Sequence, residues 1–188
     1  MTETAVEIPG YVTGTWTVDP VHSEVSFTVR HMMVSKVRGR FDKFEASIMT
    51  AADPLQSSVT ATVDLSSVNT GAPDRDNHIR SADFFEVESH PTMTFRSTGV
   101  RPAGDDDYLL DGELTLRGVT RPITLRLEIN GFGPDAYGGT RAGFSAAGEI
   151  NRNDFGVSYN GPIPGGGVAV SEKVTISLEI EAVLNKDE

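Results

Sequence analysis

The sequence contains no cysteine and is short of basic residues. Without cysteine the chain can form no disulfide, no thiolate nucleophile and no cysteine-based zinc site. With 16 Lys and Arg against 27 Asp and Glu, its formal net charge is −11. An acidic surface repels phosphate groups, which argues against nucleic acid and anionic membranes as main partners.

The chain also lacks long hydrophobic runs and a visible export signal. No apolar stretch approaches the roughly 20 residues of a membrane-spanning helix, so we expect no integral membrane segment. Residues 1–10 carry Glu3 and Glu7 and have neither a basic start nor an apolar run, which predicts a flexible N-terminal arm and a cytoplasmic protein. The length of 188 residues, 38% of them hydrophobic, suits one domain over residues 11–188.

What the sequence does contain is alternation of apolar and polar residues. Residues 107–129 hold two such runs around a turn at Gly118, with Pro122 at the start of the second. Period-two alternation gives a strand one apolar and one wet face, so this stretch predicts an antiparallel hairpin. Similar runs predict strands at 11–19, 25–31, 37–48, 59–65, 93–97, 144–150 and 170–184. An extra residue near Asp42 and Lys43 predicts a β-bulge, because the apolar parity changes there.

Residues 74–85 break this rhythm and predict the single helix of the chain. Asp74 can cap it, and Ile79, Ala82 and Phe85 recur on one side at helical spacing. Its charges predict either a solvated helix with ion pairs between residues four apart, or a polar rim at a barrel mouth. These charged residues are Asp74, Arg75, Asp76, Arg80 and Asp83.

The pattern as a whole predicts an all-β fold of roughly eight to ten antiparallel strands with one short helix. Long strands with small residues on their apolar faces favour a closed barrel over a sandwich. These small residues either leave space for a ligand or face bulky partners across a packed core. They are Ala61, Ser97, Gly112, Ala146 and Gly148.

Several stretches resemble the YceI-like family, in order along nearly the whole chain. They are Trp16-Thr-Val-Asp-Pro-Val-His-Ser-Glu-Val-Ser-Phe27 with His31, Gly39-Arg-Phe-Asp-Lys-Phe44, Arg75-Asp-Asn-His-Ile-Arg-Ser-Ala-Asp-Phe-Phe85, Pro91-Thr-Met-Thr-Phe95, Gly112-Glu-Leu-Thr-Leu-Arg-Gly-Val-Thr-Arg-Pro122 and Arg152-Asn-Asp-Phe-Gly156. The resemblance implies an antiparallel lipocalin-like β-barrel, capped by the short helix. It also implies an elongated apolar tunnel for polyisoprenoid chains, such as a polyprenyl quinone or its precursor. Many members of this family begin with an export signal and work in the periplasm.

We therefore predict a lipid-binding protein, not an enzyme, that carries or stores a long isoprenoid lipid and needs no other cofactor. One alternative is an enzyme acting on a quinone-like or isoprenoid substrate, with His22, His31 or His78 as acid or base. Another is a packed barrel that serves as a protein-interaction module, and a homodimer is compatible with each. The predicted apolar lining is Phe27, Val29, Phe41, Phe44, Ile48, Met93, Phe95, Leu114, Leu116, Leu125, Leu127, Phe144, Ala146 and Ile176.

His22 and His78 are the candidate contacts for a polar head group, because a few converging polar groups fix a ligand in an apolar pocket. If the helix caps the barrel mouth, both could meet a quinone or phenol oxygen. Otherwise His22 bonds within its own turn and His78 is solvated. No H-E-x-x-H spacing occurs and the chain has no cysteine, so we expect no metal site. Arg152 and Asp154 are expected to fix an irregular turn by hydrogen bonds.

Overall fold

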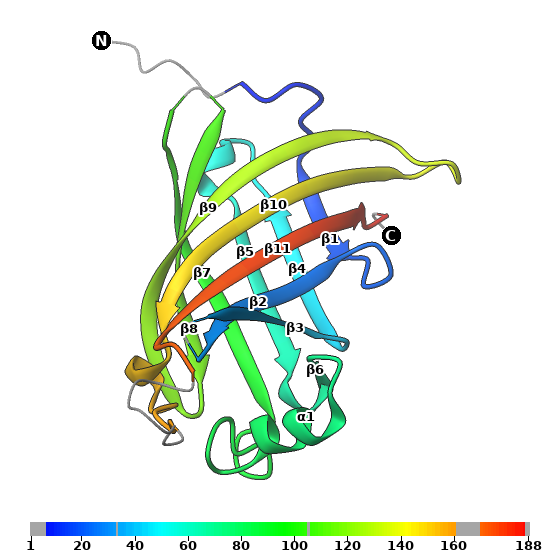
Figure 1. The fold of residues 1–188 in the computed structure, drawn as a ribbon. Coiled ribbons are helices and arrows are strands. Elements are labelled where there is room, and N and C mark those ends of the chain that lie inside the picture. The colour runs from blue at the N-terminus through cyan, green and yellow to red at the C-terminus, as the bar shows by residue number, and fades with distance from the viewer. Residues whose placement is uncertain (1–6, 33, 105, 161–169, 187–188) are drawn as a thin grey trace.

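The computed structural model describes residues 7–32, 34–104, 106–160 and 170–186. Its strands form one antiparallel sheet that curls round until β1 pairs with β11 (Figure 1). The strands are β1 (Gly14–Val18), β2 (Glu24–His31), β3 (Ser35–Phe41), β4 (Phe44–Thr50), β5 (Ser58–Asp64), β6 (Val68–Asn69), β7 (Thr92–Pro102), β8 (Asp107–Leu116), β9 (Val119–Pro134), β10 (Thr140–Asn151) and β11 (Lys173–Leu184). Three 3₁₀ turns, η1 (Pro54–Gln56), η2 (Leu65–Ser67) and η3 (Arg152–Phe155), and the helix α1 (Pro73–Arg80) complete the fold.

These segments build a closed barrel of eight strands, because three of the strands are interrupted. β1 continues into β2, β3 into β4 and β5 into β6. β1 pairs with β4 while β2 pairs with β3, and β4 pairs with β5 while β3 pairs with β6. β11 pairs with β2 over its first half and with β1 at its end. The predicted all-β antiparallel barrel with one short helix is confirmed.

The interruption between β3 and β4 falls where the change of parity predicted an extra residue. Asp42 and Lys43 lie between the two strands, and both use backbone groups to bond the neighbouring segment. The Asp42 N–H donates to the carbonyl of Ser67 (3.1 Å), and the Lys43 carbonyl accepts from the N–H of Asp64 (3.0 Å). The inserted residues turn the chain so that Phe41 and Phe44 both face the barrel interior.

The hairpin of β8 and β9 has the predicted faces. Along β8, every second residue from Tyr108 to Leu116 is buried. Arg117 and Gly118 form the turn with φ of +52° and +74°, the left-handed region that tight hairpin turns require. Pro122 lies inside β9 instead of at its start. It is tolerated there because β10 pairs with β9 only from Arg126 onward, so no described strand pairs with β9 on that edge at Pro122.

Helix α1 is shorter than predicted, and its expected cap is wrong. It covers Pro73–Arg80, with Ala72 at the N-cap position and no side-chain cap. Asp74 therefore lies in the first turn, after a proline whose fixed φ suits a helix start. Beyond Arg80 the chain turns, so that Phe85 packs on the core while Ala82 is exposed. In the described part of the chain no helix has the length and apolar character needed to cross a membrane.

A solid cluster closes the barrel where β1 meets β11. Trp16 is fully buried there and packs with Val18, Ala142 and Ala182. Its indole N–H donates to the hydroxyl of Thr50 (2.8 Å), which satisfies the one polar group of the side chain. We call this cluster of Trp16, Val18, Ala142 and Ala182 the seam.

Candidate ligand-binding site

The barrel encloses a cavity of about 710 Å³, within the range of small-molecule sites in proteins. Apolar side chains from the inner faces of the strands supply nearly all of its wall. Fifteen of the sixteen residues predicted to contact a ligand line it. They are Phe27, Val29, Phe41, Phe44, Ile48, Met93, Phe95, Leu114, Leu116, Leu125, Leu127, Phe144, Ala146, Ile176 and His78. That they contact a ligand remains a prediction.

Glycines on the inner faces let neighbouring side chains lie against the wall. A Cβ at Gly39 would come within 2.3 Å of the Phe27 ring, and one at Gly112 within 2.4 Å of the Phe95 ring. A Cβ at Gly148 would lie 2.7 Å from Cδ2 of Leu125. The small residues on the apolar faces therefore have two different roles: some make room for bulky neighbours, and others border the cavity. Gly112 and Gly148 make room for bulky neighbours.

The remaining small residues behave differently from those glycines. Ala61 and Ala146 border the cavity itself. Ser97 serves the sheet, since its hydroxyl accepts the backbone N–H of Val59 (2.9 Å). Open space and tight packing therefore occur side by side on the inner face of the same sheet.

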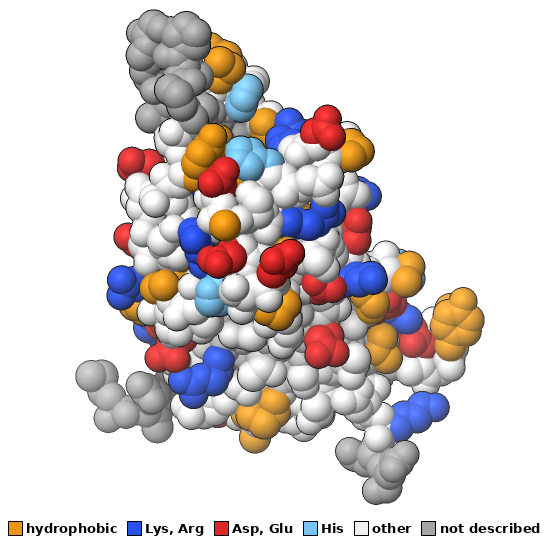
Figure 2. All heavy atoms as spheres, turned by 90° about the horizontal axis from the view of Figure 1, so that it is seen from below, with side chains coloured by type: hydrophobic (Ala, Val, Ile, Leu, Met, Phe, Trp, Pro, Cys, Tyr) orange, Lys and Arg blue, Asp and Glu red, His pale blue; other side chains and the backbone are white. Residues whose placement is uncertain are grey.

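Charged groups of the lining gather mostly at the end of the cavity where α1 lies. Asp74, Arg75 and His78 of α1 reach the cavity there, together with Thr70 and Tyr159. Figure 2 views the molecule from this end and shows histidine, acidic and basic side chains among apolar ones. At the other end Tyr11 and Thr50 reach the cavity, but both hydroxyls already donate to backbone carbonyls. Most of the charged groups that a polar ligand end could meet therefore lie beside α1.

Helix α1 is held to the preceding loop and not by ion pairs along its own face. The Asp76 carboxylate accepts from the N–H and the hydroxyl of Thr70 (2.8 and 2.6 Å), and the Arg75 guanidinium donates to the hydroxyl and carbonyl of Thr70. Arg80 donates to the carbonyls of Ser66 and Val68. Among the described residues the expected pairs four apart are absent, because these partners compete for the same side chains.

His78 stands in a group of three rings at this end of the cavity. Its centroid lies 5.0 Å from that of Phe84 and 5.1 Å from that of Tyr159, and all three pairs meet edge to face. Its Nε2 bonds the Asp83 carboxylate at 2.8 Å. The Phe84-Phe85 pair in the sequence could have signalled part of this site. Nothing local marks Tyr159, which arrives from the irregular segment after η3.

Arg152 fixes that irregular segment, as expected, and does so from inside the protein. The side chain is 4% exposed, and its N–H groups donate to the carbonyls of Ser171, Val157, Tyr159 and Val170. Burial lowers the pKa of this guanidinium below its ordinary value. Asp154 contributes its backbone carbonyl, which accepts from Arg121. Arg152 thereby shapes the cavity end that carries Tyr159.

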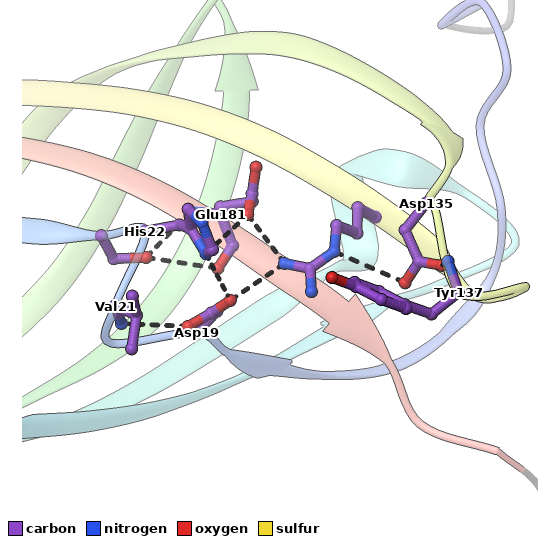
Figure 3. Close-up of polar contacts among 8 residues, drawn as sticks. Asp19, Val21, His22, Asp135, Tyr137 and Glu181 are labelled. Carbon is purple, nitrogen blue, oxygen red and sulfur yellow. Dashed lines mark hydrogen bonds and ion pairs between the residues drawn. The ribbon is translucent and has the colours of Figure 1, made fainter.

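His22 lies outside the cavity, in the loop between β1 and β2. Its Nδ1 bonds Asp19 at 2.8 Å, the local interaction expected of a turn histidine (Figure 3). Arg141 Nη1 lies 2.9 Å from the Asp19 carboxylate and 2.7 Å from that of Glu181. The bonds from His22 and Arg141 hold the pKa of Asp19 well below its usual range. We call Asp19, His22, Arg141 and Glu181 the outer clamp.

The outer clamp is also the group of described residues whose geometry could hold a metal ion. Ligand atoms of Asp19, His22 and Glu181 lie within 4.8 Å of one another. Arg141 already supplies a positive charge to both carboxylates, so the cluster is balanced by the chain itself. The absence of a bound metal remains a prediction, which elemental analysis of purified protein checks.

A closed eight-stranded antiparallel barrel around an apolar cavity defines a lipocalin-like fold. The sequence model of the YceI-like domain matches residues 16–182, and the chain belongs to this family. Over 164 residues it is 38% identical to a UPF0312 protein of Azotobacter vinelandii, covering 86% of this chain and 82% of the relative.

Solved structures show the same fold. BcnA of Burkholderia cenocepacia matches with a TM-score of 0.75 and 26% identity, over 87% of this chain and 98% of that one. A polyisoprenoid binding domain from Saccharophagus degradans, implicated in plant cell wall breakdown, matches with a TM-score of 0.67 over 93% of this chain and 100% of that one. Its identity of 18% makes it a likeness of fold alone.

Proposed function

We propose that this protein binds a long isoprenoid lipid, a polyprenyl quinone or its precursor, for carriage or storage. The observation that carries the proposal is the cavity of about 710 Å³ inside the barrel, with an almost wholly apolar wall. A prenyl chain offers only apolar surface, and each buried CH₂ contributes about 0.8 kcal/mol. A long apolar lumen therefore holds such a chain without specific polar contacts along it.

The uneven polarity of the cavity supports the head-group part of the proposal. The prenyl tail would lie along the lumen, and the quinone or phenol oxygens would face His78 and its neighbours at the α1 end. The imidazole can donate or accept a hydrogen bond, and Tyr159 and Phe84 offer ring edges and faces to a planar head. The name of the Saccharophagus degradans neighbour agrees with an isoprenoid ligand.

Native mass spectrometry of protein purified without detergent tests the proposal. We expect a co-purifying mass of a prenyl lipid, lost on denaturation and restored by incubation with a polyprenyl quinone. Protein that emerges empty from lipid-rich cells and takes up no added prenyl quinone would contradict it. A bound lipid recovered in chemically altered form would favour the enzyme alternative.

A further inference from the structure

The turn between β2 and β3 exposes apolar side chains where turns usually carry polar ones. Val34 is 86% exposed and Met32 is 41% exposed. Tight turns favour Gly, Asn, Asp and Ser, because these residues tolerate left-handed backbone or bond their own main chain. Met32 instead adopts a left-handed φ of +52°. Both the residue types and this strained conformation set the turn apart from an ordinary solvent-facing connection.

Two unpaired cations flank these apolar residues. Arg30 and Lys36 are directly opposite each other across the hairpin, on its outer face. Both side chains are exposed, and neither forms an ion pair or side-chain hydrogen bond with any described residue. Farther along β3, Arg38 and Arg40 are partly neutralised by Glu24 and Asp42. The hairpin end thus carries two unneutralised cations in a chain whose formal net charge is −11, so the net-charge argument against anionic membranes does not apply to this one local surface.

The inner face of the same hairpin belongs to the cavity wall. Val29, His31 and Val37 line the cavity, and His31 pairs with Val170 of the neighbouring segment. Residues alternate between the two sides of a strand, so the exposed tip and the cavity wall are consecutive positions of one element. A lipid passing this rim would move between the tip and the lumen along a single hairpin.

We propose that this hairpin end docks on the surface of an anionic lipid bilayer, an inference that rests on the proposed lipid ligand. Met32 and Val34 would enter the head-group region while Arg30 and Lys36 approach the lipid phosphates. Apolar side chains combined with neighbouring cations are the features by which peripheral proteins bind anionic membranes. Docking there would bring the cavity rim to the membrane from which an isoprenoid lipid must be drawn.

The charges favour a membrane over a second copy of the chain. A symmetric dimer through this tip would place Arg30 and Lys36 of two copies together, and like charges in contact repel. Another exposed apolar residue, Tyr137 at the tip of β9 and β10, lacks both supporting features. Its neighbour Asp135 is acidic, Arg141 is already paired, and neither Tyr137 nor Asp135 borders the cavity.

Vesicle co-sedimentation tests the proposal, with equal parts phosphatidylcholine and phosphatidylglycerol compared with phosphatidylcholine alone. We expect the wild type to bind the anionic vesicles, and to be released by high salt, because salt screens surface charges. Val34→Ser should weaken binding several-fold. Arg30→Glu with Lys36→Glu should weaken it at least about tenfold, since each basic residue near an anionic surface contributes to binding.

Matched variants elsewhere on the surface make the test specific. Val21→Ser removes an equally exposed valine, 84% exposed, from the loop between β1 and β2. Arg126→Glu reverses an exposed cation on β9 that forms no ion pair or side-chain hydrogen bond with the residues the structure describes. Both should bind vesicles like wild type. If the wild type ignores anionic vesicles, or if the control variants lose as much binding as the hairpin variants, the proposal is wrong.

Two further measurements separate this proposal from its alternatives. The hairpin variants should take up a prenyl quinone dispersed in detergent as well as the wild type does, because no membrane is involved. If the wild type itself takes up no prenyl quinone, the proposed ligand is wrong, and this result says nothing against docking. Sedimentation equilibrium should show the same mass for wild type and Val34→Ser. A wild-type dimer that Val34→Ser dissociates would overturn membrane docking in favour of self-association.

Discussion

Two alanines four residues apart on β10 lie in opposite kinds of interior. Ala142 is 2% exposed and packs in the seam against Trp16 and Ala182. Ala146 faces the same side of the sheet and borders the cavity. The two positions share residue type, strand and orientation, yet one lies inside the seam and the other at the wall of the cavity.

The difference comes from residues distant in the sequence. At Ala142 the indole of Trp16 and the rings of Phe132 and Phe144 fill the interior where β1 and β11 close the barrel. Ala146 packs beside Leu110 and Leu125 but also borders the cavity. Alternation along a strand therefore fixes which side chains point inward, and partners across the barrel decide whether the inside is solid.

Tryptophan at each alanine would give the largest effect and test this difference directly. Ala146→Trp should place its indole in the cavity, abolish prenyl-lipid binding and lower the thermal midpoint little. Ala142→Trp has no such space. Overpacking a core typically costs about 1–3 kcal/mol, and a whole indole more, against a domain stability of about 5–15 kcal/mol. We expect Ala142→Trp to be severely destabilised.

Thermal midpoints of lipid-free protein and binding of a prenyl quinone, both measured for the pair, give the result. Equal and large losses of stability at both positions would show that the space beside Ala146 cannot accept a side chain. The barrel would then be solid, and the lipid-binding proposal would fail with it.

Gly39→Ala should have the next largest effect, and it acts on the bore of the cavity. The new methyl group would clash with the Phe27 ring, which lies across Gly39 on the neighbouring strand. The ring must swing into the lumen, so we expect prenyl-lipid affinity to fall by about tenfold and stability by about 1–3 kcal/mol. Binding titration and thermal denaturation measure the two losses.

Gly133→Ala is the matched control for this substitution. Gly133 also lies in a strand, and a Cβ there would meet no atom within 4 Å. The variant should bind lipid like wild type and lose little stability. A Gly39→Ala protein indistinguishable from this control would show that Phe27 does not set the bore.

Much of this fold could be predicted from the sequence because period-two alternation is a local property. It indicated the inward faces of β8, β9, β10 and β11 and the change of parity at Asp42 and Lys43. The helix was harder, since the pairing of Asp76 and Arg75 with Thr70 depends on a loop rather than on helical spacing.

The candidate site, like the fold, could be predicted from the sequence only in part. The apolar lining follows from strand parity, whereas the polar end does not. Tyr159 joins His78 only because buried Arg152 folds the segment after η3 back over the barrel end. His22 and His78 looked alike in the sequence, and only the three-dimensional path of the chain places one outside and the other at the cavity. The unequal filling at Ala142 and Ala146 likewise depends on contacts between distant strands.

Lowering the pH should destabilise the barrel near the seam, because protonation of Asp19 weakens the contacts of the outer clamp. The effect should be smaller than those of the substitutions above. Bonds from His22 and Arg141 lower the pKa of Asp19 in the folded state relative to the unfolded chain. A lowered folded pKa means that this stabilisation is present above the ordinary aspartate pKa near 4 and is lost as the pH falls below it. We expect Asp19→Asn to cost about 1 kcal/mol at pH 7, and progressively less as the pH falls from about 4 towards the lowered pKa of the folded state.

Thermal midpoints of wild type and Asp19→Asn across this pH range measure the effect. Asp111, whose pKa is lowered to about 2 by Arg101 and Thr124, should keep its own acid sensitivity in both proteins. A difference between wild type and variant that grows towards low pH would contradict the assigned role of Asp19.

The smallest effect is expected from the two candidate histidines, and it sharpens the contrast between the cavity and the outside of the barrel. His78→Ala removes an imidazole from the rim while leaving the apolar wall intact. A hydrogen bond typically contributes about 0.5–1.5 kcal/mol, so prenyl-quinone affinity should fall by no more than about tenfold. His22→Ala should leave affinity unchanged, because His22 bonds Asp19 away from the lumen.

Binding titrations with a prenyl quinone and with a prenyl hydrocarbon that lacks the polar head separate the two parts of the ligand. A His78 effect confined to the quinone would place the head group beside α1. An equal loss for both ligands would instead indicate a change in the wall, and a lipid chemically altered by wild type but not by His78→Ala would make the protein an enzyme.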